Sequence, residues 1–275
     1  MDAPIDAPRQ KALLALEETS RTFFVPISRL PAGLMEAVGS AYLCLRAIDE
    51  IEDHPQLDGA TKQGLLRRIS QALQCAPDHD SPDGWIDWQF PVPDTELPEV
   101  TRSLVEWIRL APRSIAPRIQ DATAAMAERM AGWVACNWAI HNQADLDHYT
   151  FSVAGAVGLL LSDLWAWYDG TQTDRQEAIG FGRGLQAVNI LRNHAEDLQR
   201  GVDFYPAGWD SARLQDYARR NLYYADLYVN HLPPGPALDF CRMPLALAYA
   251  TLDALAQGRH KLERSEVLRI LSNSA

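Results

Sequence analysis

Three oxygen-bearing side chains recur every four residues in GLQAVNILRNHAEDLQRGVDFYP, residues 184–206. Asn189, Asn193 and Asp197 stand at i, i+4 and i+8, so they share one face if this stretch is helical. Amide and carboxylate oxygens are ligands that Mg²⁺ accepts. Arg192 and Arg200 are close enough in sequence to meet an anion. Asn189 and Asn193 alone could be ordinary polar positions of a helix. Together with Asp197 they predict a weak cation site.

A second group of carboxylates lies upstream in RAIDEIED, residues 46–53. Asp49 and Asp53 are four residues apart, which places them on one helical face about 6 Å apart along the axis. Like charges at this spacing destabilise an isolated helix, and a bound cation would relieve the repulsion. On this segment alone the favoured interpretation is a solvated helix end before His54 and Pro55, because exposed acidic pairs are common.

The two groups together indicate a more specific arrangement. Mg²⁺ ions held between two helices, each with spaced oxygen ligands, could bridge the protein to a diphosphate. Arginine side chains would bind the remaining phosphate oxygens. This chemistry suits a reaction in which diphosphate leaves and a carbocation forms in an apolar cavity.

The elements that would position these groups are helical. Apolar residues recur at i, i+3, i+4 and i+7 along the whole chain, and we find no alternating strand pattern bounded by turns. Residues 76–98 are rich in Pro and Asp; a linker between domains is one interpretation, but similar helices on both sides favour a surface loop. GFGRG, residues 180–184, has the wrong spacing for a dinucleotide loop and predicts close helix packing. We therefore expect one all-α domain over residues 1–275, with sites built from facing helices.

Composition narrows the class of protein. The 275 residues are 47% hydrophobic and 22% charged, which is ample for a large core, and the net charge of −11 argues against general nucleic-acid binding. The four cysteines form no CxxC pair and predict buried thiols in a reducing compartment. The first residues carry no apolar leader, and the longest clean apolar run, 153–161, is shorter than the ~20 residues of a membrane span. We expect a cytoplasmic protein without a transmembrane helix, and peripheral membrane contact stays open.

Five segments resemble, in the same order, segments of the squalene/phytoene synthase family, and within it the squalene synthase branch. SRTFF (20–24) resembles the family's SRSF-type opening, and AYLCLRAIDEIED (41–53) resembles its first aspartate-rich motif. DHYTFSVAGAVGLLLS (147–162) resembles the Tyr-containing helix before a VAG–VG signature. LQAVNILRNHAEDLQRGVDFYPAGW (185–209) resembles the second motif, and FCRMPLALAYATL (240–252) resembles a later helix. The segments cover nearly the whole chain, which sets the resemblance apart from a match to one motif.

The resemblance implies a fold and a role for individual residues. The fold would be the isoprenoid-synthase helical bundle with a central apolar cavity. The first motif would hold Mg²⁺ through Asp49 and Asp53, and the second through Asn189, Asn193 and Asp197. Diphosphate would be contacted by Ser20, Arg21, Arg46 and Arg192. The implied catalytic residues are Tyr149, which would assist proton transfer beside the first leaving diphosphate, and Tyr42; the prenyl cavity would be lined by Tyr42, Phe23, Gln186 and Phe240.

The implied reaction joins two farnesyl diphosphates head to head through presqualene diphosphate, and NADPH then reduces the product to squalene. Two features depart from the family pattern. Asn193 stands where the family usually has Asp, which removes a charge and should weaken Mg²⁺ binding. The chain also lacks the Lys/Arg-rich segment that helps to bind phosphates and NADPH in eukaryotic members. Transfer of a prenyl group to another acceptor, such as an aromatic one, and a catalytically idle binding or assembly protein are the alternatives.

Overall fold

A computed structural model of the protein describes residues 7–20, 22–75, 97–259 and 261–273. These residues form helices joined by short connections, and the described ranges contain no strand. The prediction of an all-α helical fold is confirmed. Contacts divide the chain into two compact units, Met1–Cys136 and Asn137–Ala275, and each is described by itself. The single domain over residues 1–275 stays a prediction.

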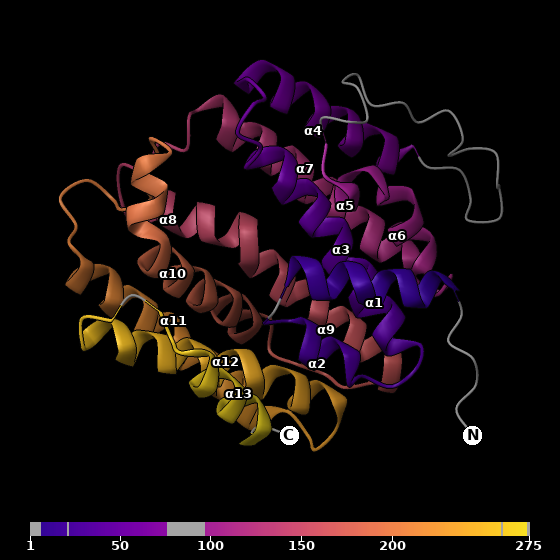
Figure 1. Ribbon diagram of the computed structural model, residues 1–275. Coiled ribbons are helices and arrows are strands. Elements are labelled where there is room, and N and C mark those ends of the chain that lie inside the picture. The colour runs from indigo at the N-terminus through magenta and orange to yellow at the C-terminus, as the bar shows by residue number, and fades with distance from the viewer. Residues whose placement is uncertain (1–6, 21, 76–96, 260, 274–275) are drawn as a thin grey trace. The chain divides into compact units, whose positions relative to one another are not determined.

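The first unit is built around helix α3 (Figure 1), and every residue of this helix is buried or half-buried. Leu34, Met35, Leu43, Ile48 and Ile51 of this helix are fully buried. α3 packs against α5, α6 and α7, while α4 lies along α7. The helices of this unit are α1 (Ala7–Thr19), α2 (Phe24–Ser28), α3 (Leu34–Glu52), α4 (Gly59–Gln74), α5 (Glu99–Arg102), α6 (Leu104–Leu110) and α7 (Ala116–Ala135).

Local sequence explains where α3 and α4 begin. The backbone N–H of Gly33 donates to the Glu36 carboxylate at 2.5 Å, and Gly33 itself has φ +86°, which glycine adopts without strain. The Asp58 carboxylate accepts from the Thr61 N–H at 2.7 Å and caps the first turn of α4. Residues 76–96 of the predicted surface loop lie outside the described residues, and Leu97 and Pro98 lead into α5.

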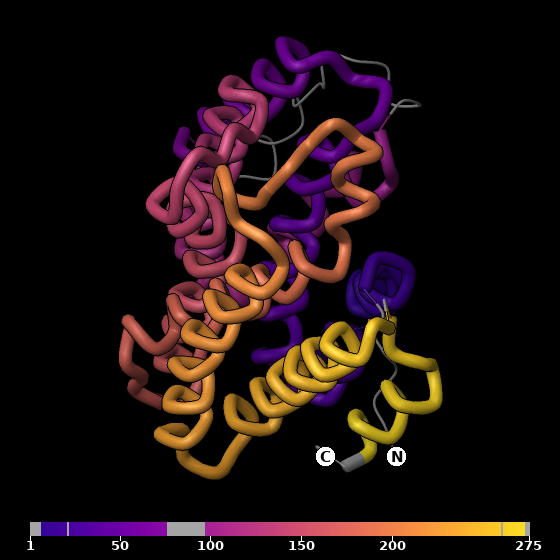
Figure 2. Tube along the Cα trace, turned by 90° about the vertical axis from the view of Figure 1, so that its left-hand side faces the viewer, coloured from indigo at the N-terminus to yellow at the C-terminus, as the bar shows by residue number. Residues whose placement is uncertain are grey.

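The second unit is organised by its longest helix, α10, which lies along α11 (Figure 1). Asp174 caps α10 by accepting from the Gln176 and Glu177 N–H groups at 2.8 and 3.0 Å. Figure 2 shows α11 turning back through residues 232–235 into α12. The elements of this unit are α8 (Gln143–Thr150), the π-helical turn η2 (Phe151–Gly155), α9 (Ala156–Asp169), α10 (Arg175–Gln199), α11 (Ser211–His231), α12 (Pro236–Ala256) and α13 (Arg264–Asn273).

Glycines let the backbone of α10 approach its neighbours. A Cβ at Gly182 would lie 2.1 Å from the Ala154 carbonyl oxygen of η2. A Cβ at Gly180 would lie 2.4 Å from the Cβ of Tyr224 on α11. No side chain fits at such distances, so the contacts require glycine. The prediction that GFGRG serves helix packing is confirmed.

One helical stretch of the described chain, Gln143–Asp169, is long and apolar enough to cross a membrane by length and composition. Its best window has a mean hydropathy of 1.3, and 44% of that window is buried. Core helices of soluble proteins pass the same test. The expected absence of a transmembrane helix therefore stays a prediction, and so does peripheral membrane contact.

Candidate active site

The polar residues predicted on α3 lie along one narrow stripe of the helix. Tyr42, Arg46, Asp49 and Asp53 follow each other at intervals of four, three and four residues. The first three are half-buried and Asp53 is exposed. Asp53 is the C-cap residue, and its N–H donates to the Asp49 carbonyl at 2.8 Å. The stripe is thus the polar edge of a helix whose other faces are buried.

Asp49 is electrostatically perturbed by its surroundings. Burial raises the pKa of its carboxyl to about 7; Arg46 opposes this shift, while Asp53 and Glu50 add to it. A cation bound beside Asp49 would favour the ionised carboxylate and oppose the effect of burial. Arg46 itself forms an ion pair with Glu50 one turn along α3. Its Nε is buried and has no hydrogen-bond partner in the described part of the chain.

Two further predicted residues of the first unit, Ser20 and Phe23, lie near Tyr42 at the start of the stripe. The Ser20 hydroxyl accepts from the Phe23 N–H at 2.9 Å. The Tyr42 hydroxyl donates to the Thr19 carbonyl at 3.4 Å, and the Phe23 and Tyr42 rings lie 5.8 Å apart. Burial raises the pKa of Tyr42 and keeps its phenol neutral. The start of the α3 stripe therefore carries a hydroxyl and two aromatic rings, and the roles of Ser20, Phe23 and Tyr42 stay predictions.

Arg21 is also a predicted diphosphate contact. It lies outside the described residues, so its role stays a prediction.

In the second unit, α10 presents its predicted ligands as a continuous helical stripe. Arg192 Nη2 donates to Asn189 Oδ1 at 2.7 Å, and Arg192 Nε donates to Asn193 Oδ1 at 3.1 Å. Asn193 Nδ2 also donates to Asn189 Oδ1 at 3.2 Å. The guanidinium of Arg192 thus rests on the two amide oxygens that the sequence assigns to a cation. A cation held by these oxygens would release Arg192 for a diphosphate.

The stripe ends at Asp197, which is 8% exposed. Its carboxylate pairs with Arg200 at 2.9 Å, within the same helical turn. His194 does not belong to the stripe: its Nε2 lies 3.3 Å from Asp203 Oδ1, and its ring stacks on Tyr205 at 3.8 Å. His194 therefore faces away from Asn193.

The donor sets fit Mg²⁺ rather than a softer metal. α3 offers two carboxylates, and α10 offers two amide oxygens and one carboxylate, with no thiolate or imidazole among these ligands. Within the described ranges, no three His, Cys, Asp or Glu side chains cluster as a metal centre. Such a cluster is not expected within either unit, because the α3 stripe has two carboxylates and the α10 stripe one.

Tyr149 lies at the end of α8 and is 4% exposed. Its ring stacks on Phe204 at 4.5 Å with an interplanar angle of 18°. Gln186 lies one turn before Asn189 on α10 and is half-buried. Phe240 is 3% exposed and its ring lies 5.5 Å from Trp165, so this contact is core packing. The prenyl-pocket roles of Gln186 and Phe240 stay predictions.

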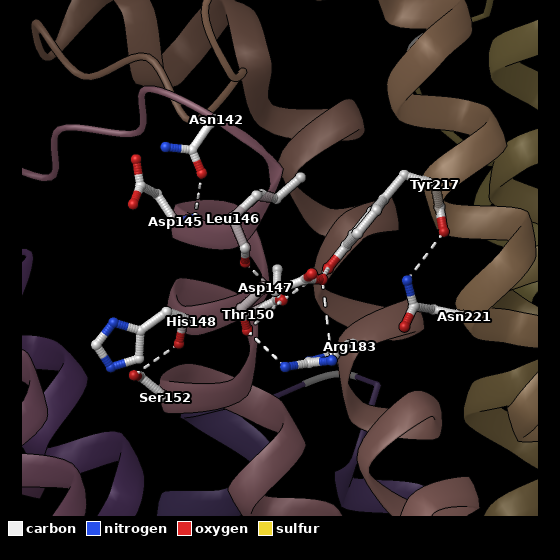
Figure 3. Close-up of polar contacts among 10 residues, drawn as sticks. All are labelled: Asn142, Asp145, Leu146, Asp147, His148, Thr150, Ser152, Arg183, Tyr217 and Asn221. Atoms are coloured by element: carbon white, nitrogen blue, oxygen red, sulfur yellow. Dashed lines mark hydrogen bonds and ion pairs between the residues drawn. The ribbon is translucent and has the colours of Figure 1, made fainter.

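Sequence reasoning missed a polar network that includes Asp147 and Thr150, which flank Tyr149 in the sequence (Figure 3). Tyr217 of α11 donates to Asp147 Oδ1 at 2.8 Å and lies 3.0 Å from the Thr150 hydroxyl. Arg183 of α10 donates to the Asp147 carbonyl at 3.0 Å. A carboxylate and a threonine at i, i+3 in α8, flanking Tyr149, are the only sequence signal. That signal does not name partners as distant in sequence as Tyr217.

Comparisons with known proteins identify the family to which the chain is similar. The profile of the family described as squalene/phytoene synthase matches residues 16–209, which include both stripes. The squalene synthase of Rattus norvegicus is 29% identical over 87% of this chain and 62% of its own length. That of Homo sapiens is 28% identical over 94% of this chain and 68% of its own length. The chain thus spans about three fifths to two thirds of these curated relatives.

Two solved structures share the fold. A ligand complex of TcSQS has a TM-score of 0.81 at 22% identity and covers 98% of this chain and 86% of its own. A dehydrosqualene synthase in complex with a ligand has a TM-score of 0.67 at 17% identity and covers 96% of this chain and 94% of its own. The profile match covers well over half of the residues and includes both polar stripes. The chain therefore belongs to the squalene/phytoene synthase family.

Proposed function

We propose that the protein is a Mg²⁺-dependent prenyltransferase that joins two farnesyl diphosphates head to head. Two C15 diphosphates would form presqualene diphosphate with release of one pyrophosphate. A hydride from NADPH would then give squalene and a second pyrophosphate. The observation that carries the proposal is the α10 stripe, because a metal-ligand pattern and an arginine poised on its oxygens suit a diphosphate that arrives with cations. Membership of the family supports the same reaction class.

The residues of each stripe would divide the work of releasing diphosphate. Bound Mg²⁺ would neutralise charge that develops on the leaving diphosphate. The ligands would be Asp49 and Asp53 in the first unit, and Asn189, Asn193 and Asp197 in the second. Arg46 and Arg192 would donate to the remaining phosphate oxygens, and Ser20 would add a hydroxyl donor. Arg46 is suited to this because it lies one turn before Asp49 on the same stripe of α3.

Aromatic residues would protect the cation that remains after diphosphate leaves. The paired rings of Phe23 and Tyr42 would line the prenyl chain in the first unit. Tyr149 would lie beside the first leaving diphosphate and move a proton through its phenolic oxygen. Its stacking on Phe204 fixes the plane of its ring. Apolar walls of this kind keep water away from a carbocation.

Product analysis tests the proposal. Purified protein is incubated with farnesyl diphosphate and Mg²⁺, with and without NADPH; extracts are analysed by mass spectrometry and pyrophosphate is measured in parallel. We expect presqualene diphosphate without NADPH and squalene with it. A hydroxylated C30 product in both conditions would show that water ends the reaction instead of NADPH. Pyrophosphate release only with an added aromatic acceptor would assign another prenyl transfer, and no turnover with either would indicate a binding protein.

Replacing Asn193 by aspartate should leave turnover equal or raise it at low Mg²⁺. The added carboxylate supplies a charged ligand, and Asp197 and Asn189 remain in place. The measurement is a Mg²⁺ titration of pyrophosphate release, in which the half-saturating Mg²⁺ concentration should fall. A sharp loss of activity at saturating Mg²⁺ would show that the amide of Asn193 has a role of its own. In that case its contacts with Arg192 and Asn189 would be the feature to explain.

The site of action is part of the same proposal. The substrate is a charged, water-soluble lipid and the C30 product is apolar, so a cytoplasmic protein with peripheral membrane contact fits the reaction. Sedimentation of the protein with liposomes, in the presence and absence of product, would measure that contact.

A further inference from the structure

Helix α11 makes two buried tyrosine contacts with the preceding helices of its unit. The Tyr217 hydroxyl lies 3.0 Å from the Thr150 hydroxyl, and the Tyr228 hydroxyl lies 3.1 Å from the Ser162 hydroxyl. Both pairs join a phenol of α11 to a small hydroxyl on the α8–α9 segment. The Tyr217 phenol also reaches a carboxylate, that of Asp147, at 2.8 Å (Figure 3).

Counting hydrogens identifies the donor and the acceptor in each hydrogen bond among Asp147, Tyr217 and Thr150. A carboxylate only accepts, so the single hydrogen of the Tyr217 phenol goes to Asp147. The Thr150 hydroxyl must then donate to Tyr217. The competing acceptor for this single hydrogen is the Leu146 carbonyl, 2.8 Å from the Thr150 hydroxyl. That carbonyl keeps a hydrogen bond without the hydroxyl, because it receives the helical N–H of Thr150. Burial raises the pKa of Tyr217, and its hydrogen bond to Asp147 raises it as well, which keeps the phenol a donor.

Arg183 fixes Asp147 from a third helix. Its Nη2 donates to the Asp147 carbonyl at 3.0 Å, and its Nη1 lies 3.9 Å from Asp147 Oδ1. The guanidinium also lies 6.0 Å from the centre of the Phe151 ring, the first residue of η2. Asp147 is therefore held through both its backbone and its carboxylate, by α10 and α11.

These contacts lie on both sides of Tyr149 in the sequence. Asp147 and Thr150 are three residues apart on one face of α8, and Tyr149 points to another face, where it stacks on Phe204. α8 has eight residues and continues directly into a π-helical turn. α8 is thus the first part of the continuous helical stretch Gln143–Asp169, and the π-helical turn interrupts the regular backbone hydrogen bonds between α8 and α9. Side-chain contacts with α10 and α11 hold α8 on the other side of this interruption.

We propose that Tyr217 is a positioning residue for Tyr149: its hydroxyl joins Asp147 and Thr150 and fixes the α8–η2 junction that carries the Tyr149 ring. The role of Tyr149 in turnover rests on the proposed function. The effect of Tyr217 on the α8–η2 junction does not, and it can be measured without substrate.

The test compares Tyr217→Phe with Tyr228→Phe. Each variant removes one buried phenol oxygen of α11 that contacts a small hydroxyl, Thr150 or Ser162, and only Tyr217→Phe also removes the contact with Asp147. A role limited to the packing of α11 would give similar changes in both variants. By hydrogen exchange with mass spectrometry, we expect faster exchange at residues 145–155 in Tyr217→Phe. In Tyr228→Phe, faster exchange should be confined to residues around Ser162. Unchanged exchange at 145–155 in Tyr217→Phe would overturn the proposal.

Turnover gives a second readout. With farnesyl diphosphate, Tyr217→Phe should lower kcat by about 10- to 100-fold, as expected for a misplaced catalytic group, with little change in KM. Tyr228→Phe should keep kcat within about threefold, because the Tyr228 hydroxyl contacts Ser162 of α9 and not α8, which carries Tyr149. Equal losses of kcat in the two variants would contradict a positioning role. If the wild-type protein releases no pyrophosphate, the proposed function fails, and the exchange experiment still decides the effect of Tyr217 on the junction.

A conservative change at the partner completes the test. Asp147→Asn keeps an oxygen that accepts from Tyr217, whereas Asp147→Leu removes it. We expect Asp147→Asn to exchange at 145–155 nearly as slowly as the wild type, and Asp147→Leu to match Tyr217→Phe. The double variant Tyr217→Phe/Asp147→Leu should lose no more kcat than either single one, because both remove the same hydrogen bond. Additive losses would show that the two residues act independently.

Discussion

Replacing Asp53 by alanine is expected to lower pyrophosphate release at least about 1000-fold, equivalent to roughly 4 kcal/mol of transition-state stabilisation. The folded protein should be as stable as the wild type or slightly more stable. Asp53 is exposed at the C-terminal end of α3, where a negative charge interacts unfavourably with the helix dipole. It also lies one turn from Asp49, whose pKa its charge raises. A side chain that costs stability at this position fits a metal ligand better than a structural residue.

The control is Asp121→Ala, which removes an exposed carboxylate from α7 in the same unit. Turnover and the unfolding temperature are measured for both variants, together with the shift in unfolding temperature on adding Mg²⁺ and a non-hydrolysable farnesyl diphosphate analogue. Asp121→Ala should behave as the wild type, while Asp53→Ala should lose most of the ligand-induced shift. Wild-type turnover in Asp53→Ala would remove Asp53 from the metal site.

Replacing Gly182 by alanine is expected to destabilise the protein by at least about 3 kcal/mol, or about 5–10 °C in unfolding temperature. The added Cβ would meet the Ala154 carbonyl oxygen at 2.1 Å, and that oxygen belongs to the backbone of η2. A flexible side chain could move aside, but here the π-helical turn and α10 must separate. Since η2 follows the helix that carries Tyr149, the same change should also lower kcat in any folded fraction.

Gly132→Ala is the matched control for this substitution. Gly132 also lies inside a long helix, α7, but no atom lies within 4 Å of the Cβ that alanine would add. Alanine there should be neutral or stabilise by up to about 1 kcal/mol, because it is the better helix former. Thermal unfolding of both variants measures the difference. If Gly182→Ala unfolds at the wild-type temperature, the close approach of α10 to η2 is not a feature of the folded protein.

The two stripes could be predicted from the sequence because each lies within one helix. The spacing of Asp49 and Asp53, and of Asn189, Asn193 and Asp197, fixes a shared face wherever the segment is helical. Likewise, the glycines of residues 180–184 predicted close packing, since glycine suits a position without space for a side chain. These inferences need only local geometry.

Other features depend on which faces of different helices meet, and periodicity does not report this. The contact of Tyr217 with Asp147 joins residues 70 positions apart, and nothing in α8 specifies a partner on α11. The π-helical turn after Thr150 has no sequence signal that separates it from a regular helix. The hydrogen bonds from Arg192 to the amides of Asn189 and Asn193 were missed for another reason. The sequence suggested an external anion as the partner of Arg192, but in this structure the arginine donates to acceptors on its own helix.

The most direct test of the proposed chemistry is a crystal structure with Mn²⁺ and farnesyl thiodiphosphate, in which anomalous scattering locates the metal. The proposal predicts Mn²⁺ within about 2.3 Å of oxygens from Asp49 and Asp53, and of oxygens from the α10 stripe. It also predicts that the Arg192 guanidinium leaves the amides of Asn189 and Asn193 and binds the diphosphate. A bound analogue with no metal at either stripe, and with Arg192 still on the two amides, would contradict it.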